Sequence, residues 1–96
     1  MTRDIEHIIE EVKRRLPSVE FHQLRVKNPQ VDDDGIWWFY LPGIDKEIQI
    51  ESSDGMCPFM VEHDDMRSAC EAESARSVGE AVEKVVTYLT CLKEKM

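Results

Sequence analysis

Apolar residues near the start of the chain recur with the period of an α-helix. They are spaced at i, i+3, i+4, i+7 and i+11, at Ile5, Ile8, Ile9, Val12 and Leu16. This spacing places them along one side of a helix. Thr2 or Asp4 can cap the start of that helix, and Pro17 prevents it from continuing. The pattern therefore predicts an amphipathic helix that ends before Pro17.

A second amphipathic pattern occupies the C-terminal part of the chain. Ser77 and Glu80 match a capping box, in which serine stands at the N-cap and glutamate three residues later. The apolar residues that follow keep helical spacing, at Val78, Ala81, Val82, Val85, Val86, Leu89 and Leu92. Because valine is a weak helix former, we expect this helix to depend on packing against the rest of the protein.

Between these two helices, short apolar runs alternate with turn residues. Strands are predicted at 19–26, 36–41, around 48–50 and at 58–62, and residues 69–75 fit either a fifth strand or a helix. Short turns favour antiparallel neighbours. The sequence thus predicts an α+β fold in one globular domain, residues 1–96. Its two layers are an antiparallel sheet of four to five strands and the N-terminal and C-terminal helices, packed on one face of that sheet.

The run at 36–41 departs from the pattern of a half-exposed strand. Side chains alternate along a strand, so one side carries Ile36, Trp38 and Tyr40, and the other carries Trp37, Phe39 and Leu41. Both sides are apolar, whereas a sheet with helices on one face is expected to be polar on the other. Monomers seldom leave such a surface bare. We therefore expect a cover over the second side: a loop such as residues 63–75, a second copy of the chain, or a different protein.

The charged residues are unevenly distributed along the chain. It has 96 residues with 12 Lys or Arg and 20 Asp or Glu, a formal net charge of −8. Residues 32–75 hold twelve acids and two bases, net −10, and each flanking segment is net +1. Such a surface repels nucleic acid and attracts basic partners, although solvated acidic loops are the simpler interpretation. The charge argues against a nucleic-acid interface built on Arg14, Arg15, Arg25 and Lys27.

Cysteine and histidine offer candidate chemistry within the acidic segment. Cys57 lies in a predicted turn, and His22 or His63 would be a base able to generate its thiolate. A small enzyme or ligand-binding domain that uses Cys57 and His63 is therefore an alternative interpretation, and these two residues are its weak catalytic candidates. A buried structural cysteine is the commoner outcome.

Potential metal ligands are present without the spacing of a known metal site. Five fall within fourteen residues: Cys57, His63, Asp64, Asp65 and Cys70. They lack the close ligand pairs of zinc sites. The acids at 32–34 are adjacent, whereas the ligands of an EF-hand alternate with other residues. No metal and no cofactor is predicted.

No segment resembles a membrane span or a secretion signal. The longest apolar run, residues 36–41, is far shorter than the ~20 residues that a membrane helix needs. The three cysteines, Cys57, Cys70 and Cys91, are an odd number and cannot form a complete set of disulfides. We therefore expect a cytoplasmic protein with reduced thiols and no membrane partner.

Together these features favour a small acidic interaction module without enzymatic activity. It would bind a partner protein, or a second copy in a homodimer, through Trp37, Trp38, Phe39 and Tyr40. A second alternative is an inhibitor of a basic protein, because the chain is similar in size and charge to small acidic immunity proteins that block toxin nucleases. The order of helix, antiparallel strands and helix also resembles double-stranded RNA-binding domains, which present basic residues where this chain is acidic.

Overall fold

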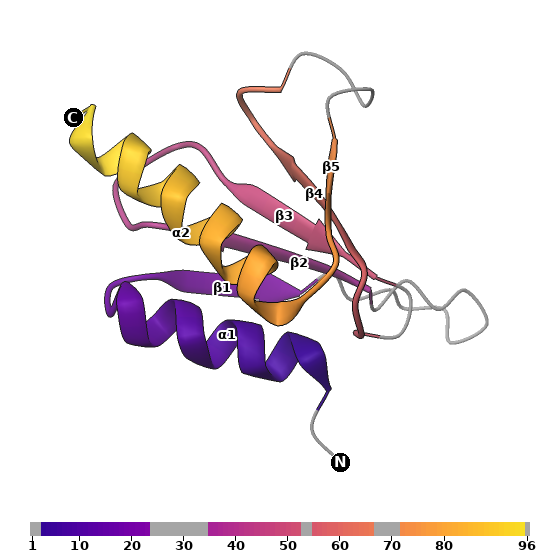
Figure 1. Ribbon diagram of the computed structural model, residues 1–96. Coiled ribbons are helices and arrows are strands. Elements are labelled where there is room, and N and C mark those ends of the chain that lie inside the picture. The colour runs from indigo at the N-terminus through magenta and orange to yellow at the C-terminus, as the bar shows by residue number, and fades with distance from the viewer. Residues whose placement is uncertain (1–2, 24–34, 53–54, 67–71, 96) are drawn as a thin grey trace.

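One antiparallel sheet of five strands forms the centre of the protein, with a helix before it and a helix after it (Figure 1). The computed structural model describes residues 3–23, 35–52, 55–66 and 72–95. The elements follow in the order α1 (Asp4–Arg15), β1 (Glu20–Gln23), β2 (Ile36–Tyr40), β3 (Ile48–Glu51), β4 (Phe59–His63), β5 (Glu73–Ala75) and α2 (Val78–Glu94). The strands lie side by side in chain order and each is antiparallel to the next. The predicted α+β fold is confirmed.

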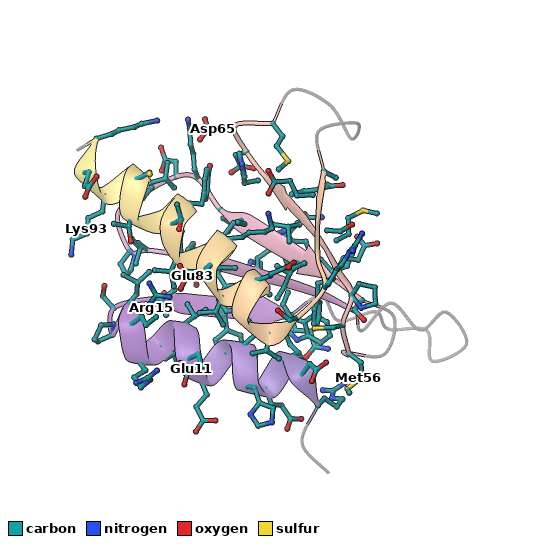
Figure 2. The ribbon with its side chains drawn as sticks, in the orientation of Figure 1. Glu11, Arg15, Met56, Asp65, Glu83 and Lys93 are labelled. Atoms are coloured by element: carbon teal, nitrogen blue, oxygen red, sulfur yellow. The ribbon has the colours of Figure 1, made fainter. Side chains whose placement is uncertain are left out.

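The core lies on one face of this sheet, where both helices pack. Every strand except β1 contributes fully buried side chains to it: Trp37, Phe39, Ile48, Ile50, Phe59, Val61 and Ala75. They meet the apolar sides of α1 and α2, and Phe21 of β1 packs against the same cluster. An ion pair between Arg15 of α1 and Glu83 of α2 joins the two helices at their outer surface (Figure 2). The sheet thus has one covered face and one face that neither helix covers.

Helix α1 has the predicted apolar side but a different start. Ile5, Ile8 and Val12 are buried, as the helical spacing requires. The N-cap is Arg3, which makes no side-chain capping hydrogen bond, so the prediction that Asp4 caps the helix is wrong. The Asp4 carboxylate instead accepts a hydrogen bond of 2.9 Å from the backbone N–H of Cys57. A contact distant in sequence, which no local pattern reveals, therefore replaces the local cap.

Helix α2 begins as the capping box predicts. The Ser77 hydroxyl accepts a hydrogen bond of 3.2 Å from the Glu80 N–H, and the Glu80 carboxylate accepts one of 2.9 Å from the Arg76 N–H. Its apolar side is buried at Ala81, Val82, Val85, Val86, Leu89 and Leu92. No helix in the described part of the chain is long and apolar enough to cross a membrane.

The structure assigns a strand to the segment that the sequence left open. Residues 73–75 form β5, which pairs with β4 through Phe59–Ala75, Met60–Ser74 and Val61–Glu73. The predicted first strand is present as β1, and the residues expected to continue it, 24–26, lie outside the described ranges. The same holds for most of the predicted turns at 28–35 and 53–55 and for Cys70.

Candidate functional site: the open face of the sheet

Strand β2 sends its aromatic residues to opposite faces of the sheet. Trp37 and Phe39 are 2% and 0% exposed and lie in the core beneath the helices. Trp38 and Tyr40 lie on the other face and are half-buried. Of the four residues predicted to contact a partner, Trp37 and Phe39 therefore have no surface to offer, because the helices already cover them. The candidate surface narrows to the side that carries Trp38 and Tyr40.

We call this uncovered side the open face. By strand alternation and register it consists of Glu20, His22, Ile36, Trp38, Tyr40, Glu47, Gln49, Glu51, Met60, Glu62 and Ser74. Aromatic side chains gather on β2, and carboxylates stand on β1, on β3 and the residue before it, and on β4. This arrangement of an aromatic centre with a polar rim is typical of protein-binding surfaces.

A row of side chains crosses four strands of the open face at its centre. Register places His22, Trp38, Gln49 and Glu62 side by side on β1 to β4. The His22 ring stacks on the Trp38 indole with 4.9 Å between ring centroids and an angle of 25°. The indole N–H donates to Gln49 Oε1 at 3.1 Å, and Gln49 Nε2 donates to Glu62 Oε2 at 3.4 Å. The row fixes the indole from both sides.

These lateral contacts explain how the second side of β2 is sheltered from water. The sequence predicted a cover lying over it, because three large side chains would otherwise be bare. Among the described residues, His22 stacks on the indole and meets the Tyr40 ring edge-on, and Gln49 accepts a hydrogen bond from the indole N–H. His63 and Asp64, from the loop considered as a cover, line the small cavity beside Trp38. Trp38 and Tyr40 remain half-buried among the described residues.

The rim of the open face is acidic. Glu20, Glu47, Glu51 and Glu62 all belong to it, and none of its residues is a lysine or arginine. Its one basic group is His22, whose Nε2 lies 3.6 Å from Glu47 Oε1. A hydrogen bond with the Glu20 carboxylate, together with desolvation, raises the pKa of Tyr40. The face therefore presents negative potential around an aromatic centre.

A small cavity opens on the open face beside Trp38. Its volume is about 100 Å³ and it is lined by Trp38, Glu47, Gln49, Glu62, His63 and Asp64. Backbone contacts hold its acidic end, because Asp64 Oδ2 accepts from the Glu47 N–H at 2.9 Å. The cavity thus combines an indole, a fixed amide, the Glu62 carboxylate of β4, and the carboxylates of Glu47 and Asp64, which flank β3 and β4.

Cys57 and His63, the two candidate catalytic residues, are not brought together. Cys57 precedes β4 and His63 ends it, a separation of roughly 20 Å along an extended strand. Figure 2 shows their neighbours Met56 and Asp65 at opposite ends of the sheet. Burial, with a hydrogen bond to Asp4, raises the pKa of the Cys57 thiol to about 11. Its nearest charged group is a carboxylate, which disfavours the thiolate that nucleophilic catalysis needs.

His63 belongs instead to a polar network that ties the end of β4 to α2. Its ring stacks on Tyr88 with 4.1 Å between centroids, and its Nδ1 accepts the Asp65 N–H at 3.2 Å. The Tyr88 hydroxyl donates to Asp65 Oδ2 at 2.9 Å, and Lys46 pairs with the other oxygen. Burial and the hydrogen bond to Asp65 raise the pKa of Tyr88, and the Lys46 and Tyr88 contacts lower that of Asp65. These groups stack, pair and hydrogen-bond with one another, which indicates a structural role.

A second hollow lies on the helix side, between α2 and the strands β3–β5. It measures about 420 Å³ and has Ile48 and Val61 among its lining residues. Most of its polar side chains are already paired: Lys84 with Glu73 at 2.6 Å, and Tyr88 with Asp65. His63 lines it but Cys57 does not, so this hollow does not unite the two candidate catalytic residues.

Two further kinds of site that the sequence brings into question can be located in part. Arg14 and Arg15, considered for nucleic-acid binding, pair with Glu11 and Glu83, while Arg25 and Lys27 lie outside the described residues. Among the residues that the structure describes, no three His, Cys, Asp or Glu side chains are grouped closely enough to hold a metal ion.

Gln49 and Glu62 are the site residues that sequence reasoning missed. The alternation of polar and apolar residues at 47–51 indicates that Gln49 faces away from the core. Its position beside Trp38 depends on the register between β2 and β3, which alternation alone does not determine. Comparisons of the chain with models of protein families, with curated proteins and with solved structures give no match. The functional argument therefore depends on this geometry.

Proposed function

We propose that this protein is a non-catalytic interaction module that docks a basic partner protein on the open face of its sheet. The observation that supports this most strongly is the row from His22 to Glu62, an ordered aromatic centre within a carboxylate rim. Aromatic anchors at the centre of a face supply most of the affinity in protein interfaces, and complementary charge steers the encounter. Both ingredients occur here on a surface that the helices leave free.

The distribution of charge favours a basic partner over a second copy of the chain. In a twofold homodimer the same patch would face itself. The carboxylates of Glu20, Glu47, Glu51 and Glu62 would then face the same acidic rim on the other copy, with His22 as the one basic residue of the open face on each side. Like charges placed opposite each other across an interface are unfavourable by several kcal/mol. A partner that carries lysine or arginine avoids this repulsion.

The same charge and contacts argue against the enzymatic alternative. The thiol of Cys57 is half-buried beside the Asp4 carboxylate, and no imidazole in the described part of the chain contacts it. An inhibitor of a basic enzyme would, by contrast, use the proposed surface unchanged. That alternative is a special case of the same proposal, in which the docked partner loses activity.

The experiment that tests this proposal begins by placing a photo-crosslinking amino acid at Met60, which is 48% exposed on the open face. A matched probe at Glu10, exposed on α1, reports on the helix side. Partners captured through Met60 and not through Glu10 are purified and titrated against the wild-type chain. We expect Trp38→Ala to weaken binding at least tenfold, Glu10→Gln to leave it unchanged, and added salt to reduce it.

Two results would contradict the proposal. One is a purified partner that binds Trp38→Ala as tightly as wild type, which would remove the open face from the interface. The other is a dimer in light scattering that dissociates on Trp38→Ala substitution, because the face would then be occupied by a second copy. We expect a monomer at micromolar concentration.

A further inference from the structure

The small cavity beside Trp38 is the most specific feature of the open face, and its size limits what can occupy it. At about 100 Å³ it is below the range of roughly 300–1,000 Å³ that holds small-molecule ligands. It matches the head group of a single side chain. Its open position on a proposed docking surface allows such a side chain to enter from a partner.

Of the three carboxylates that line the cavity, Glu47 lies 3.6 Å from His22 Nε2, and Glu62 and Asp64 make no ion pair within the described part of the chain. Glu62 has one long hydrogen bond, from Gln49 Nε2 at 3.4 Å, and Asp64 accepts the Glu47 N–H. Among the described residues, the lysine nearest in sequence to this end of the sheet, Lys46, pairs with Asp65 instead. A positive group entering the cavity would therefore meet uncompensated carboxylates.

The indole wall distinguishes between positively charged groups. A guanidinium is planar, stacks on aromatic rings and carries five donors that reach several acceptors at once, whereas an ammonium is a compact, strongly hydrated point charge. Here carboxylates come from Glu47, which precedes β3, and from Glu62 of β4, and the Trp38 indole lines the same cavity. Gln49 holds the indole and Glu62 in place before anything binds. Such pre-organisation favours the planar group.

We infer that the open face recognises an arginine side chain of its partner, inserted beside Trp38 between the carboxylates of Glu47, Glu62 and Asp64. This inference rests on the proposed function, because it specifies which side chain of the basic partner the open face binds. In protein interfaces, arginine paired with carboxylates and an aromatic ring is a recurrent source of affinity.

The test uses three short peptides that differ in one side chain: acetyl-Gly-Arg-Gly-amide and its lysine and citrulline analogues. Citrulline keeps the shape of arginine without its charge. Each is titrated into the isotope-labelled protein, and the indole and side-chain amide resonances are followed by NMR. We expect the arginine peptide to shift Trp38 and Gln49 and to bind at least fivefold more tightly than the lysine peptide, with no binding of citrulline. The buried indole of Trp37 is the internal reference and should not move.

Matched variants assign the effect to the cavity. Glu62→Gln and Asp64→Asn should each weaken arginine binding at least threefold, while Glu10→Gln on α1, which makes the same change in net charge, should leave it unaltered. The resonances of the core show that each variant is folded. Equal loss in Glu62→Gln and Glu10→Gln would mean attraction by net charge alone and would overturn the inference.

The outcomes separate this inference from the proposed function. If lysine and arginine peptides shift the same open-face resonances with equal affinity, the arginine site is wrong and docking of a basic partner stands. If no peptide moves Trp38 while a purified partner still depends on Trp38, again only the arginine site fails. If the arginine peptide binds at the cavity but the partner ignores Trp38→Ala, the proposed docking surface is the part that is wrong.

Discussion

The two faces of strand β2 contain similar aromatic residues in very different surroundings. On the core face, Trp37 meets the ring of Phe59 edge-on, with 6.4 Å between centroids, and both are sealed by the helices. On the open face, Trp38 is held by an imidazole, an amide and neighbouring carboxylates. Adjacent tryptophans therefore have separate tasks: one fills the core, and the other is kept in place at the surface.

The surroundings of Trp38 show how a small sheet protein can retain an aromatic surface in water. Packing against polar neighbours removes the edges of a ring from solvent while its outer surface stays accessible. Each such contact is worth about 0.5–1.5 kcal/mol, less than complete burial of the ring provides. The remaining free energy is available when a partner covers the face. The two faces can therefore be distinguished by experiment.

Substitution of the two tryptophans should give the largest contrast. Trp37→Ala leaves a cavity among Phe59 and the helix residues and should lower the free energy of unfolding by about 3–5 kcal/mol. Trp38→Ala removes one stack and one hydrogen bond at a half-buried position and should lower it by about 1 kcal/mol. Urea denaturation followed by far-UV circular dichroism measures both.

Trp37→Leu is a second variant for the core face, for use where Trp37→Ala does not fold. Its free energy of unfolding should lie between those of Trp37→Ala and Trp38→Ala. Comparable losses for Trp37→Leu and Trp38→Ala would contradict the division of tasks, because they would mean that the open-face indole carries as much of the fold as the core one.

The reactivity of Cys57 should show that its thiol is not activated for nucleophilic attack. With a pKa raised to about 11 from an ordinary 9.0, the thiolate fraction at pH 8 is about one-hundredth of that of a free thiol. The greater nucleophilicity of a high-pKa thiolate recovers roughly tenfold of this. In a Cys70→Ser, Cys91→Ser background, alkylation at pH 8 should therefore be about tenfold slower than that of glutathione, or slower still because of burial.

Cys91 provides the control, since it is exposed on α2 and should react like a free thiol when it is the remaining cysteine. Reaction of Cys57 faster than that of Cys91 would revive the enzymatic alternative and count against a purely interacting protein.

The two helices and the positions of the first four strands along the chain were predictable because their signals are local. The spacing from Ile5 to Leu16 and the capping box at Ser77 specify each helix within its own residues. What sequence could not supply is the choice between the sides of β2, since both are apolar. That choice follows from register: Phe39 pairs opposite Ile48, whose neighbours place the apolar side toward the helices.

The candidate site was predictable only in outline. The aromatic run drew attention to β2, but half of its predicted contact residues, Trp37 and Phe39, are in the core. The partners of Trp38 come from β1, β3 and β4, and their meeting depends on three strand registers. Asp4 is a further example: a residue that reads as a cap binds the backbone of Cys57, which is far along the chain.

Acid titration should separate the polar contacts of the helix side from those of the open face. The ion pair with Lys46 lowers the pKa of Asp65 below its ordinary 3.8. A lowered carboxyl pKa stabilises the folded state above the unfolded-state value, and this stabilisation is lost as the pH falls through the folded-state value. Asp65→Asn should therefore melt a few degrees below wild type at pH 7, with the difference closing below about pH 3.8.

Asp45→Asn is the matched control, since Asp45 is an exposed carboxylate in the loop between β2 and β3. It should melt like wild type across the same range. A difference between Asp65→Asn and wild type that persists below pH 3 would show that the amide disturbs packing against Tyr88, and that the charge of Asp65 is not the cause.

The smallest expected effect is on the quenching of Trp38 fluorescence by a cation and by an anion. This measurement reports directly on the electrostatic potential of the open face. Trp37→Phe leaves Trp38 as the one tryptophan of the chain. The carboxylates around it should concentrate caesium and exclude iodide, because a potential near the thermal energy changes local ion concentrations by a factor of two to three in each direction. Relative to N-acetyltryptophanamide at equal ionic strength, the ratio of caesium to iodide quenching should rise roughly two- to fivefold. Glu62→Gln should lower this ratio and Glu10→Gln should not. A ratio equal to that of N-acetyltryptophanamide would mean that the carboxylate rim exerts no electrostatic field at the Trp38 ring. Charge could then not select the partner.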